Sequence, residues 1–181
     1  MILSKNDLKE YMSADRIALG RHADFTLRDW MFDPIWKYER ILRKLEYCIN
    51  CKHKGSLARM YYWFRLHSLG VKLGFTISPN TFGKGLSIAH YGSIVCSSDM
   101  KVGDNCRIHS GVNIGAGRGG VPIIGDNCYL GPGAKLFGGI VLGDNVKVGA
   151  NAVVNKSFPA GHCTLVGVPA RKVSDGSLKD A

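Results

Sequence analysis

The sequence lacks any apolar run that approaches the roughly 18 uncharged residues of a membrane-spanning helix. Its first residues, MILSKNDLKEYM, carry charges where a secretory signal has its apolar segment. Low-complexity tracts are also missing, and 45% of the residues are hydrophobic against 21% charged. These absences argue against a membrane-spanning, exported or disordered chain, and they predict a folded protein of the cytoplasm.

The chain of 181 residues has six cysteines and no apparent export signal. Without an export signal, that number indicates reduced thiols and not a disulfide framework. Cys48 and Cys51, followed by His53, resemble half of a zinc motif, but no second Cys/His pair stands at matching spacing downstream. We therefore expect no bound metal.

Acidic residues are few, 14 against 24 Lys and Arg, which gives a formal net charge of +10. Such a chain attracts anions: nucleic acid, an anionic membrane surface or a polyphosphorylated cofactor. Because no nucleic-acid-binding motif accompanies the charge, we expect no nucleic-acid partner. Residues 37–72 are both basic and aromatic, which predicts solvated helix faces, with peripheral membrane contact or an acidic partner as the alternative. The cations of this stretch are Lys37, Arg40, Arg43, Lys44, Lys52, Lys54, Arg59, Arg65 and Lys72.

Residues 1–75 have the apolar spacing of helices. One face is formed by Tyr38, Ile41, Leu42, Leu45, Cys48 and Ile49, after a start signal at Asp33-Pro34. A second face begins after Ser56 and is expected to end near Gly70. The sequence therefore predicts a small helical N-terminal region.

A period of six replaces the helical pattern after residue 75. Large apolar residues stand six apart in three separate runs. The longest run is Ile124, Leu130, Leu136, Leu142, Val148 and Val154. An earlier run, in a different register, is Val102, Ile108 and Ile114, and a third is Phe82, Ile88 and Ile94. No α-helix has this period. Three short strands per coil of 18 residues explain it, with Ile124 stacked on Leu142. The small positions between them are Cys106, Val112, Cys128, Ala134, Val146 and Ala152, so the cysteines among them are expected to be wall residues.

The fold class is therefore mainly β: a parallel β-helix of hexapeptide repeats over residues 76–173, after the helical region 1–75 and before a C-terminal tail, 174–181. The register slips between Ile114 and Ile124, where ten residues replace six. The extra residues lie in the glycine-rich stretch 115–122, which predicts a loop that leaves the coil. Such loops on rigid scaffolds often carry function.

These residues resemble the hexapeptide-repeat acyltransferases, and within them the serine acetyltransferase type. The resemblance covers about residues 57–173 and depends on four features: Ser87-Ile-Ala-His90-Tyr, the glycine loop, the hexads and the closing Val166-Gly-Val-Pro-Ala-Arg171. It implies a left-handed coil, acetyl-coenzyme A (acetyl-CoA) as co-substrate, and a homotrimer with sites between subunits.

The same resemblance implies the site residues. The family's catalytic histidine falls on His90, and an imidazole with a pKa near ~6.5 is suited to act as a general base. Substrate contacts are expected from Tyr91, His109 and Arg118. The channel for the pantetheine arm matches Gly115, Ala116, Pro132, Gly133 and Ala150, and the cations for the phosphates and adenine match Lys156, Arg171 and Lys172.

Three positions depart from the serine enzymes. Thr76 and Ala89 stand where those enzymes have an Asp, and Val121 stands where they have a second His after the loop. Without these carboxylates, the protein offers no counter-charge for the ammonium group of a free amino acid. We therefore expect transfer to a hydroxyl of a sugar or polysaccharide precursor. Serine O-acetylation in cysteine biosynthesis is the alternative. The short N-terminal region predicts a trimer and not a dimer of trimers.

Proteins of two other functional classes can have the same hexapeptide-repeat coil. A metal lyase of the carbonic anhydrase type needs three histidines around zinc, and only His90 and His109 lie in suitable places within the repeats. A non-catalytic solenoid that binds an acidic surface through its helical half would show no saturable coenzyme A binding.

Overall fold

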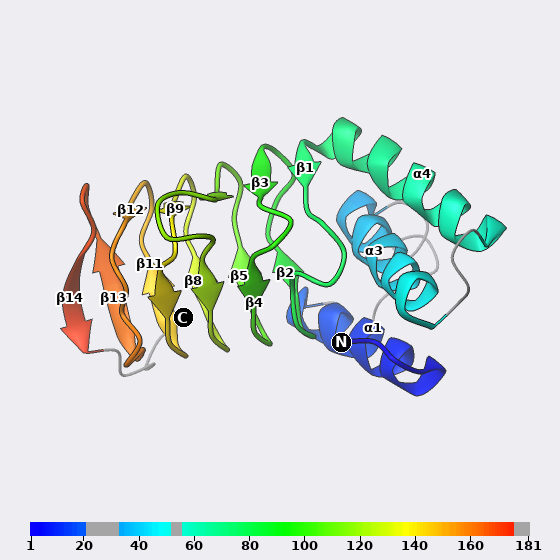
Figure 1. Ribbon diagram of the computed structural model, residues 1–181, viewed down its shortest axis with the longest axis horizontal. Coiled ribbons are helices and arrows are strands. Elements are labelled where there is room, and N and C mark those ends of the chain that lie inside the picture. The colour runs from blue at the N-terminus through cyan, green and yellow to red at the C-terminus, as the bar shows by residue number, and fades with distance from the viewer. Residues whose placement is uncertain (21–32, 52–55, 176–181) are drawn as a thin grey trace.

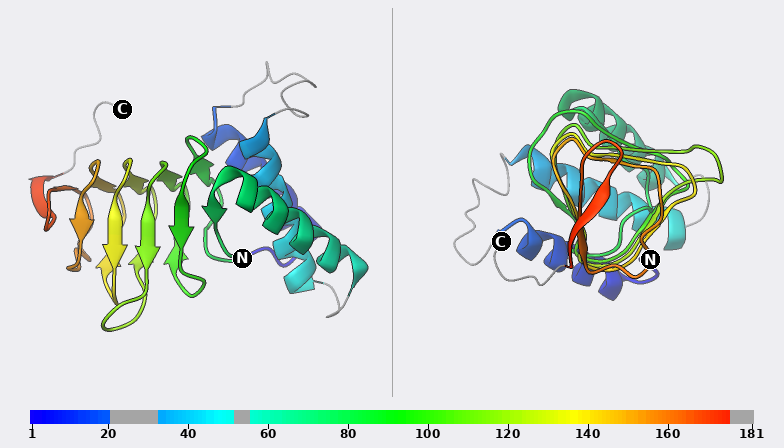
Figure 2. Two further views of the ribbon diagram at one scale, coloured as in Figure 1. Left: turned by 90° about the horizontal axis from the view of Figure 1, so that it is seen from above. Right: turned by 90° about the vertical axis from the view of Figure 1, so that its left-hand side faces the viewer.

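The computed structural model describes residues 1–20, 33–51 and 56–175. Within these ranges, three helices gather at one end of a stack of short strands, which forms a prism with a triangular cross-section when seen end-on (Figures 1 and 2). Lys52, His53, Lys54 and the part of the predicted tail after Asp175 lie outside the described residues.

The helices begin at polar caps. In α1 (Lys5–Ala18), Ser4 Oγ accepts from the Asp7 N–H, and before α3 (Pro34–Cys51), Asp33 Oδ1 accepts from the N–H groups of the next turn. Ser56 caps α4 (Leu57–Leu73). The predicted end of this last helix near Gly70 is wrong: Gly70 is buried inside α4, where a Cβ would lie 2.8 Å from the Phe75 carbonyl oxygen. The helix ends at Gly74, whose φ of 82° is left-handed.

In the part of the chain that the structure describes, fourteen strands form three sheets, one for each face of the prism. All pairs are parallel except β13–β14. The first sheet contains β1 (Phe75–Thr76), β3 (Ile94–Cys96), β6 (Asn113–Gly115), β9 (Lys135–Phe137) and β12 (Val153–Val154). The second contains β4 (Lys101–Val102), β7 (Ile123–Ile124) and β10 (Val141–Leu142). The third contains β2 (Ser87–Ile88), β5 (Arg107–Ile108), β8 (Tyr129–Leu130), β11 (Val146–Val148), β13 (Cys163–Val166) and β14 (Arg171–Asp175).

The coil register predicted from the period of six is confirmed. Ile124 pairs with Val102 on one side and Leu142 on the other, and Leu130 lies between Ile108 and Val148. The small positions are buried beside these ladders. Burial raises the pKa of the Cys128 thiol to about 11, as expected for an inert wall residue.

The third predicted register is wrong at its last member. Cys96, and not Ile94, pairs with Ile114. The cause is a longer corner: Ile88 pairs with Ile108, and the Ser93 carbonyl oxygen accepts from the Gly111 N–H. The same corner therefore contains four residues, 89–92, in this coil and two residues, 109–110, in the next coil. The two additional residues shift the pairing of the following strand by two positions.

A buried ionic cluster joins the helices to the first coil. Arg43 of α3 is fully buried, and its Nε lies 2.7 Å from Asp15 Oδ2 of α1. Its Nη1 lies 2.9 Å from Glu46 Oε2 and donates to the Phe82 carbonyl oxygen. Arg43 is therefore a core residue, and its inclusion among the solvated cations of 37–72 is wrong. A buried arginine needs such partners because an uncompensated charge in the interior is strongly destabilising.

Candidate active site

His90 lies on the long corner between β2 and β3. The corner is held at both ends, since the Ala89 N–H donates to the Ile108 carbonyl oxygen (2.9 Å) and the Gly92 N–H donates to the Leu73 carbonyl oxygen (2.9 Å). Between these anchors, His90 and Tyr91 are exposed to solvent. The additional residues of the corner thus present an imidazole on the outside of the prism, where a substrate can reach it.

His109 lies beside His90, one coil along. Their ring centroids are 6.1 Å apart, and the His109 ring is 5.1 Å from that of Tyr129 in the following coil. His109 Nε2 is buried and has no hydrogen-bond partner among the described residues. Burial, and then the charges of Arg107 and His90, lower the pKa of His109. The lowered pKa favours the neutral form of this ring beside the exposed imidazole.

Glu39 of α3 supports this corner from inside the protein. Its Oε1 accepts from the Ile88 N–H (3.1 Å), two residues before His90. The side chain is fully buried, its Oε2 has no hydrogen-bond partner among the described residues, and burial raises the pKa of its carboxyl well above the usual value. Sequence reasoning missed this residue, although the spacing of Glu39, Arg43 and Glu46 on one helix face could have indicated a buried polar cluster.

Pro132 and Ala150 occupy the same corner in later coils. The Asn151 N–H donates to the Pro132 carbonyl oxygen (2.8 Å), and the Gly133 N–H donates to the Ser110 carbonyl oxygen (2.9 Å). Ser110, Pro132 and Ala150 therefore form one column along the edge of the prism, with the His90 corner at its N-terminal end. Both Pro132 and Ala150 are exposed, as residues along a ligand channel must be.

Two glycines of the predicted channel have packing reasons of their own. A Cβ on Gly115 would lie 2.9 Å from the Phe137 ring, and one on Gly133 would lie 2.1 Å from Asn151 Oδ1. Gly133 also has a left-handed φ of 73°. The close stacking of coils accounts for both glycines, whatever role they have toward a ligand.

The glycine-rich loop leaves the prism at a different corner, between β6 and β7. Gly117 and Gly120 exchange backbone hydrogen bonds of 2.9 and 3.1 Å, which form a narrow hairpin with Arg118 exposed near its tip. The loop projects from the triangle in the end-on view (Figure 2, right). Ala116 lies at its base, and Lys156 follows β12 at the corresponding corner further along the stack.

The predicted site residues are thus divided between two edges of one chain. The edge between the third and first sheets carries His90, Tyr91, His109, Pro132, Gly133 and Ala150. The edge between the first and second sheets lies close to the other group, Gly115, Ala116, Arg118 and Lys156. Arg171 and Lys172 lie on β14 at the end of the stack, and Lys172 forms an ion pair with Asp175. One copy of the chain does not bring the two edges together.

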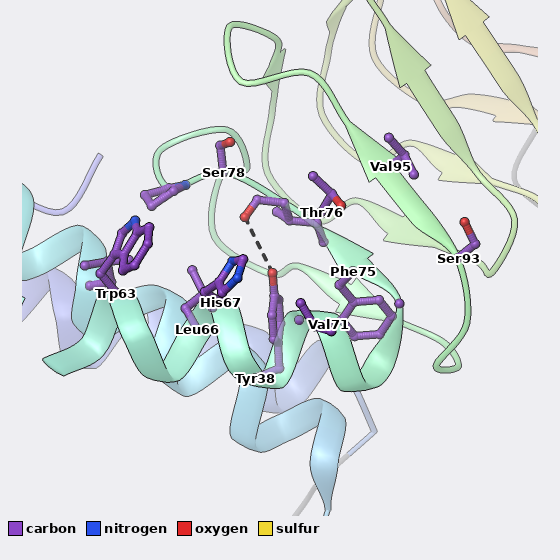
Figure 3. Close-up of a pocket in the computed structure, with 15 residues that line it drawn as sticks. Tyr38, Trp63, Leu66, His67, Val71, Phe75, Thr76, Ser78, Ser93 and Val95 are labelled. Carbon is purple, nitrogen blue, oxygen red and sulfur yellow. Dashed lines mark hydrogen bonds between the residues drawn. The ribbon is translucent and has the colours of Figure 1, made fainter. Parts of the chain in front are cut away.

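A groove of about 490 Å³ lies next to the His90 corner, between α4 and the first sheet (Figure 3). Trp63 and His67 of α4 face Thr76 and Ser78 across it, and Ser93 lines its far end. None of the described residues that line it carries a carboxylate. The groove thus offers aromatic rings and hydroxyl groups, but no counter-charge for a cation.

The described residues hold neither a metal-binding cluster nor a membrane span. Within 1–20, 33–51 and 56–175, no group of three or more His, Cys, Asp and Glu side chains is placed to hold a metal ion. In the same ranges, no helix is long and apolar enough to cross a membrane.

Comparison with known proteins identifies relatives of both sequence and structure. A family model described as bacterial transferase hexapeptide (six repeats) matches residues 122–156. The serine acetyltransferase of Helicobacter pylori is 35% identical over 135 residues, which cover 70% of this chain and 78% of that protein. Among solved structures, Neisseria gonorrhoeae serine acetyltransferase in complex with serine has a TM-score of 0.75 at 25% identity, covering 95% of this chain and 71% of the other. Brucella abortus serine acetyltransferase in complex with coenzyme A has a TM-score of 0.74 at 25% identity, covering 96% and 70%. These matches confirm a left-handed parallel β-helix preceded by helices.

Proposed function

Because the chain belongs to the serine acetyltransferase family of hexapeptide-repeat acyltransferases, we propose that it transfers the acetyl group of acetyl-CoA to the hydroxyl of serine. The observation that carries the proposal is the 35% identity to the Helicobacter pylori enzyme over most of both chains. The expectation of a sugar or polysaccharide acceptor, drawn from Thr76, Ala89 and Val121, is wrong: the relatives that carry the resemblance are serine acetyltransferases. The chain is an acetyltransferase, as the sequence predicts.

His90 performs the proton transfers in the proposed reaction. Its exposed imidazole takes the proton of the serine hydroxyl as the oxygen attacks the thioester carbonyl carbon. When the tetrahedral intermediate collapses, the carbon–sulfur bond breaks, and the imidazolium returns the proton to the departing thiolate. The lowered pKa of His109 favours its neutral form, which does not repel the charge that forms on the neighbouring ring.

Coenzyme A binding is proposed along the column that follows the His90 corner. Ser110, Pro132 and Ala150 are small or compact residues in register, so a pantetheine arm can run along the coil stack past them. Arg171 and Lys156 are exposed cations suited to phosphates, whereas Lys172 already has a carboxylate partner in Asp175. The relative in complex with coenzyme A supports this assignment.

A homotrimer is proposed as the active form, because the predicted site residues lie on two edges of the prism. A neighbouring copy can place its loop and Arg118 beside the His90 corner of the first. We also propose a cytoplasmic location, since all six cysteines are free and fit a reducing compartment.

The test is product identification. The purified chain is incubated with acetyl-CoA and serine, free thiol is followed over time, and the acetylated product is identified by mass spectrometry. We expect thiol release that depends on serine and yields O-acetylserine. Absence of this product, or faster release with sugar acceptors than with serine, would overturn the proposal.

A further inference from the structure

Helix α4 is apolar on the side that faces away from the protein as well as on the side that packs. Leu66 is buried, and Tyr62 and Leu69 pack against the core. On the outer side, a stripe of Leu57, Met60 and Phe64 runs along the first half of the helix, with each side chain at least 62% exposed. Figure 1 shows α4 at the outside of the helical region, with α3 on its inner side. An exposed apolar stripe of this length marks an interaction surface.

Within α3 and α4, the charges that are not buried have one sign. The two acidic residues of α3, Glu39 and Glu46, are buried, and α4 has none. A hollow of about 180 Å³ between α3 and α4 is lined by cations and two tyrosines: Lys37, Arg40, Lys44, Arg65, Tyr61 and Tyr62, together with Ile41. We name these cations with their tyrosines the basic hollow.

Two of these cations, Lys44 and Arg65, contact neutral groups of the protein. Lys44 Nζ lies 5.7 Å from the centroid of the Tyr62 ring. Arg65 Nη1 donates to Tyr61 Oη (3.1 Å), and its guanidinium carbon lies 5.6 Å from the same ring. Since rings and hydroxyl groups are neutral, the basic hollow is suited to an anionic group from outside the protein.

We propose that the α4 stripe and the basic hollow dock together on an anionic lipid bilayer, with α4 lying in the plane of the interface. The stripe inserts among the acyl chains, and the hollow receives a phosphate headgroup. Tyr61 and Trp63, both exposed, flank the stripe with the aromatic rings that favour the headgroup region. The helix lies on the membrane and does not cross it, in agreement with the absence of a spanning helix in the described ranges.

The charge pattern favours a bilayer over a two-fold contact between the α4 helices of two copies. A symmetric contact through α4 would bring the cations of two basic hollows toward each other, and like charges in contact are unfavourable. An anionic bilayer neutralises the same cations. This docking is independent of the acceptor of the acetyl group, so either proposal can fail without the other.

Vesicle co-sedimentation of the full chain tests the proposal. Vesicles of phosphatidylcholine alone are compared with vesicles that contain about 30% phosphatidylglycerol, at low and high salt. We expect binding to the anionic vesicles, weakened by salt, and little binding to the neutral ones. The triple variant Lys37→Gln, Lys44→Gln, Arg65→Gln should lower the partition coefficient on the order of a hundredfold. The variant Met60→Ser, Phe64→Ser should lower it by a similar factor, because its exposed apolar side chains no longer insert.

The matched control removes the same number of charges from α1. Lys5→Gln, Lys9→Gln, Arg16→Gln changes three exposed cations and is expected to lower the partition coefficient less than tenfold. Circular dichroism and light scattering are measured on every variant. The proposal is overturned if wild-type chain ignores anionic vesicles, or if the control loses as much binding as the triple variant. It is also overturned if Met60→Ser, Phe64→Ser lowers the oligomer mass and leaves vesicle binding intact, since a second copy then covers the stripe.

Discussion

The imidazole rings of His90 and His109 lie side by side on successive coils, with their centroids 6.1 Å apart, one exposed and one partly buried. The two rings have different surroundings. His90 faces solvent, whereas burial and the charge of Arg107 lower the pKa of His109.

The state of His109 can be measured by NMR titration of the imidazole signals. We expect His109 to titrate below the usual histidine pKa of about 6.5. The substitution Arg107→Gln removes one cause of the lowered pKa and should raise it, whereas Arg118→Gln, which removes a charge from the loop, should leave it unchanged. Titration of His109 above the usual value in the wild-type chain would refute this assignment.

Glu39 predicts a pH dependence of stability. Burial raises the pKa of its carboxyl in the folded protein, so the folded state binds more protons than the unfolded state at pH values above the unfolded pKa of about 4.3. The contribution of Glu39 to stability is therefore fully present below that value and is lost as pH rises toward the folded pKa.

The variant Glu39→Gln removes this dependence. Urea unfolding between pH 4.5 and 8 should show a smaller fall in the free energy of unfolding than in wild type, with the difference at most about 1.4 kcal/mol for each pH unit. Glu10→Gln, at an exposed glutamate on α1, serves as the control and should keep the wild-type slope. An unchanged slope in Glu39→Gln would show that this carboxyl is ionised in the core.

The stacking of coils can be tested with two glycines of similar conformation. Gly20 has a φ of 71°, and a Cβ there would have no described residue within 4 Å, whereas Gly161 has a φ of 65° and a Cβ there would lie 2.2 Å from the Asp144 carbonyl oxygen. Gly20→Ala should cost about 1–2 kcal/mol for the left-handed backbone alone. Gly161→Ala should cost about 1–3 kcal/mol more, because the next coil must move. Equal losses by thermal or urea unfolding would mean that the coils are less tightly stacked.

Ala89 predicts weak binding of serine. The position directly before the base offers no carboxylate for the ammonium group of an amino acid, and the neighbouring groove offers none among its described lining residues. Ala89→Asp should therefore lower the KM for serine by about tenfold, the effect of one charge-assisted hydrogen bond. Ala89→Asn, which matches the shape without the charge, should lower it much less. A KM unaffected by Ala89→Asp would place the ammonium group elsewhere.

The sequence predicted the coil well because its regular part is periodic. Ile124, Leu130 and Leu136 have the spacing of one coil, so their stacking partners follow from arithmetic alone. The same arithmetic failed at Ile94, since a period does not show where a corner takes additional residues. Those residues include His90, which the family resemblance singles out as the candidate base and the period does not.

The helical region was less predictable, because a charged residue on a helix is usually solvated. Arg43 and Glu39 look like surface residues in the sequence, and only the docking of α1 and the first coil buries them. The acceptor was also misjudged. The absence of carboxylates at Thr76 and Ala89 is real, but absent groups alone did not determine the acceptor.

The most direct test of the account is turnover by a His90→Gln variant with acetyl-CoA and serine. Glutamine keeps a polar group at the corner but cannot act as a base near neutral pH. The account predicts a fall in kcat/KM of about 10²- to 10⁴-fold, with circular dichroism and the unfolding transition unchanged because the side chain is exposed. A folded His90→Gln variant with wild-type turnover would contradict the account, since another group would then remove the proton.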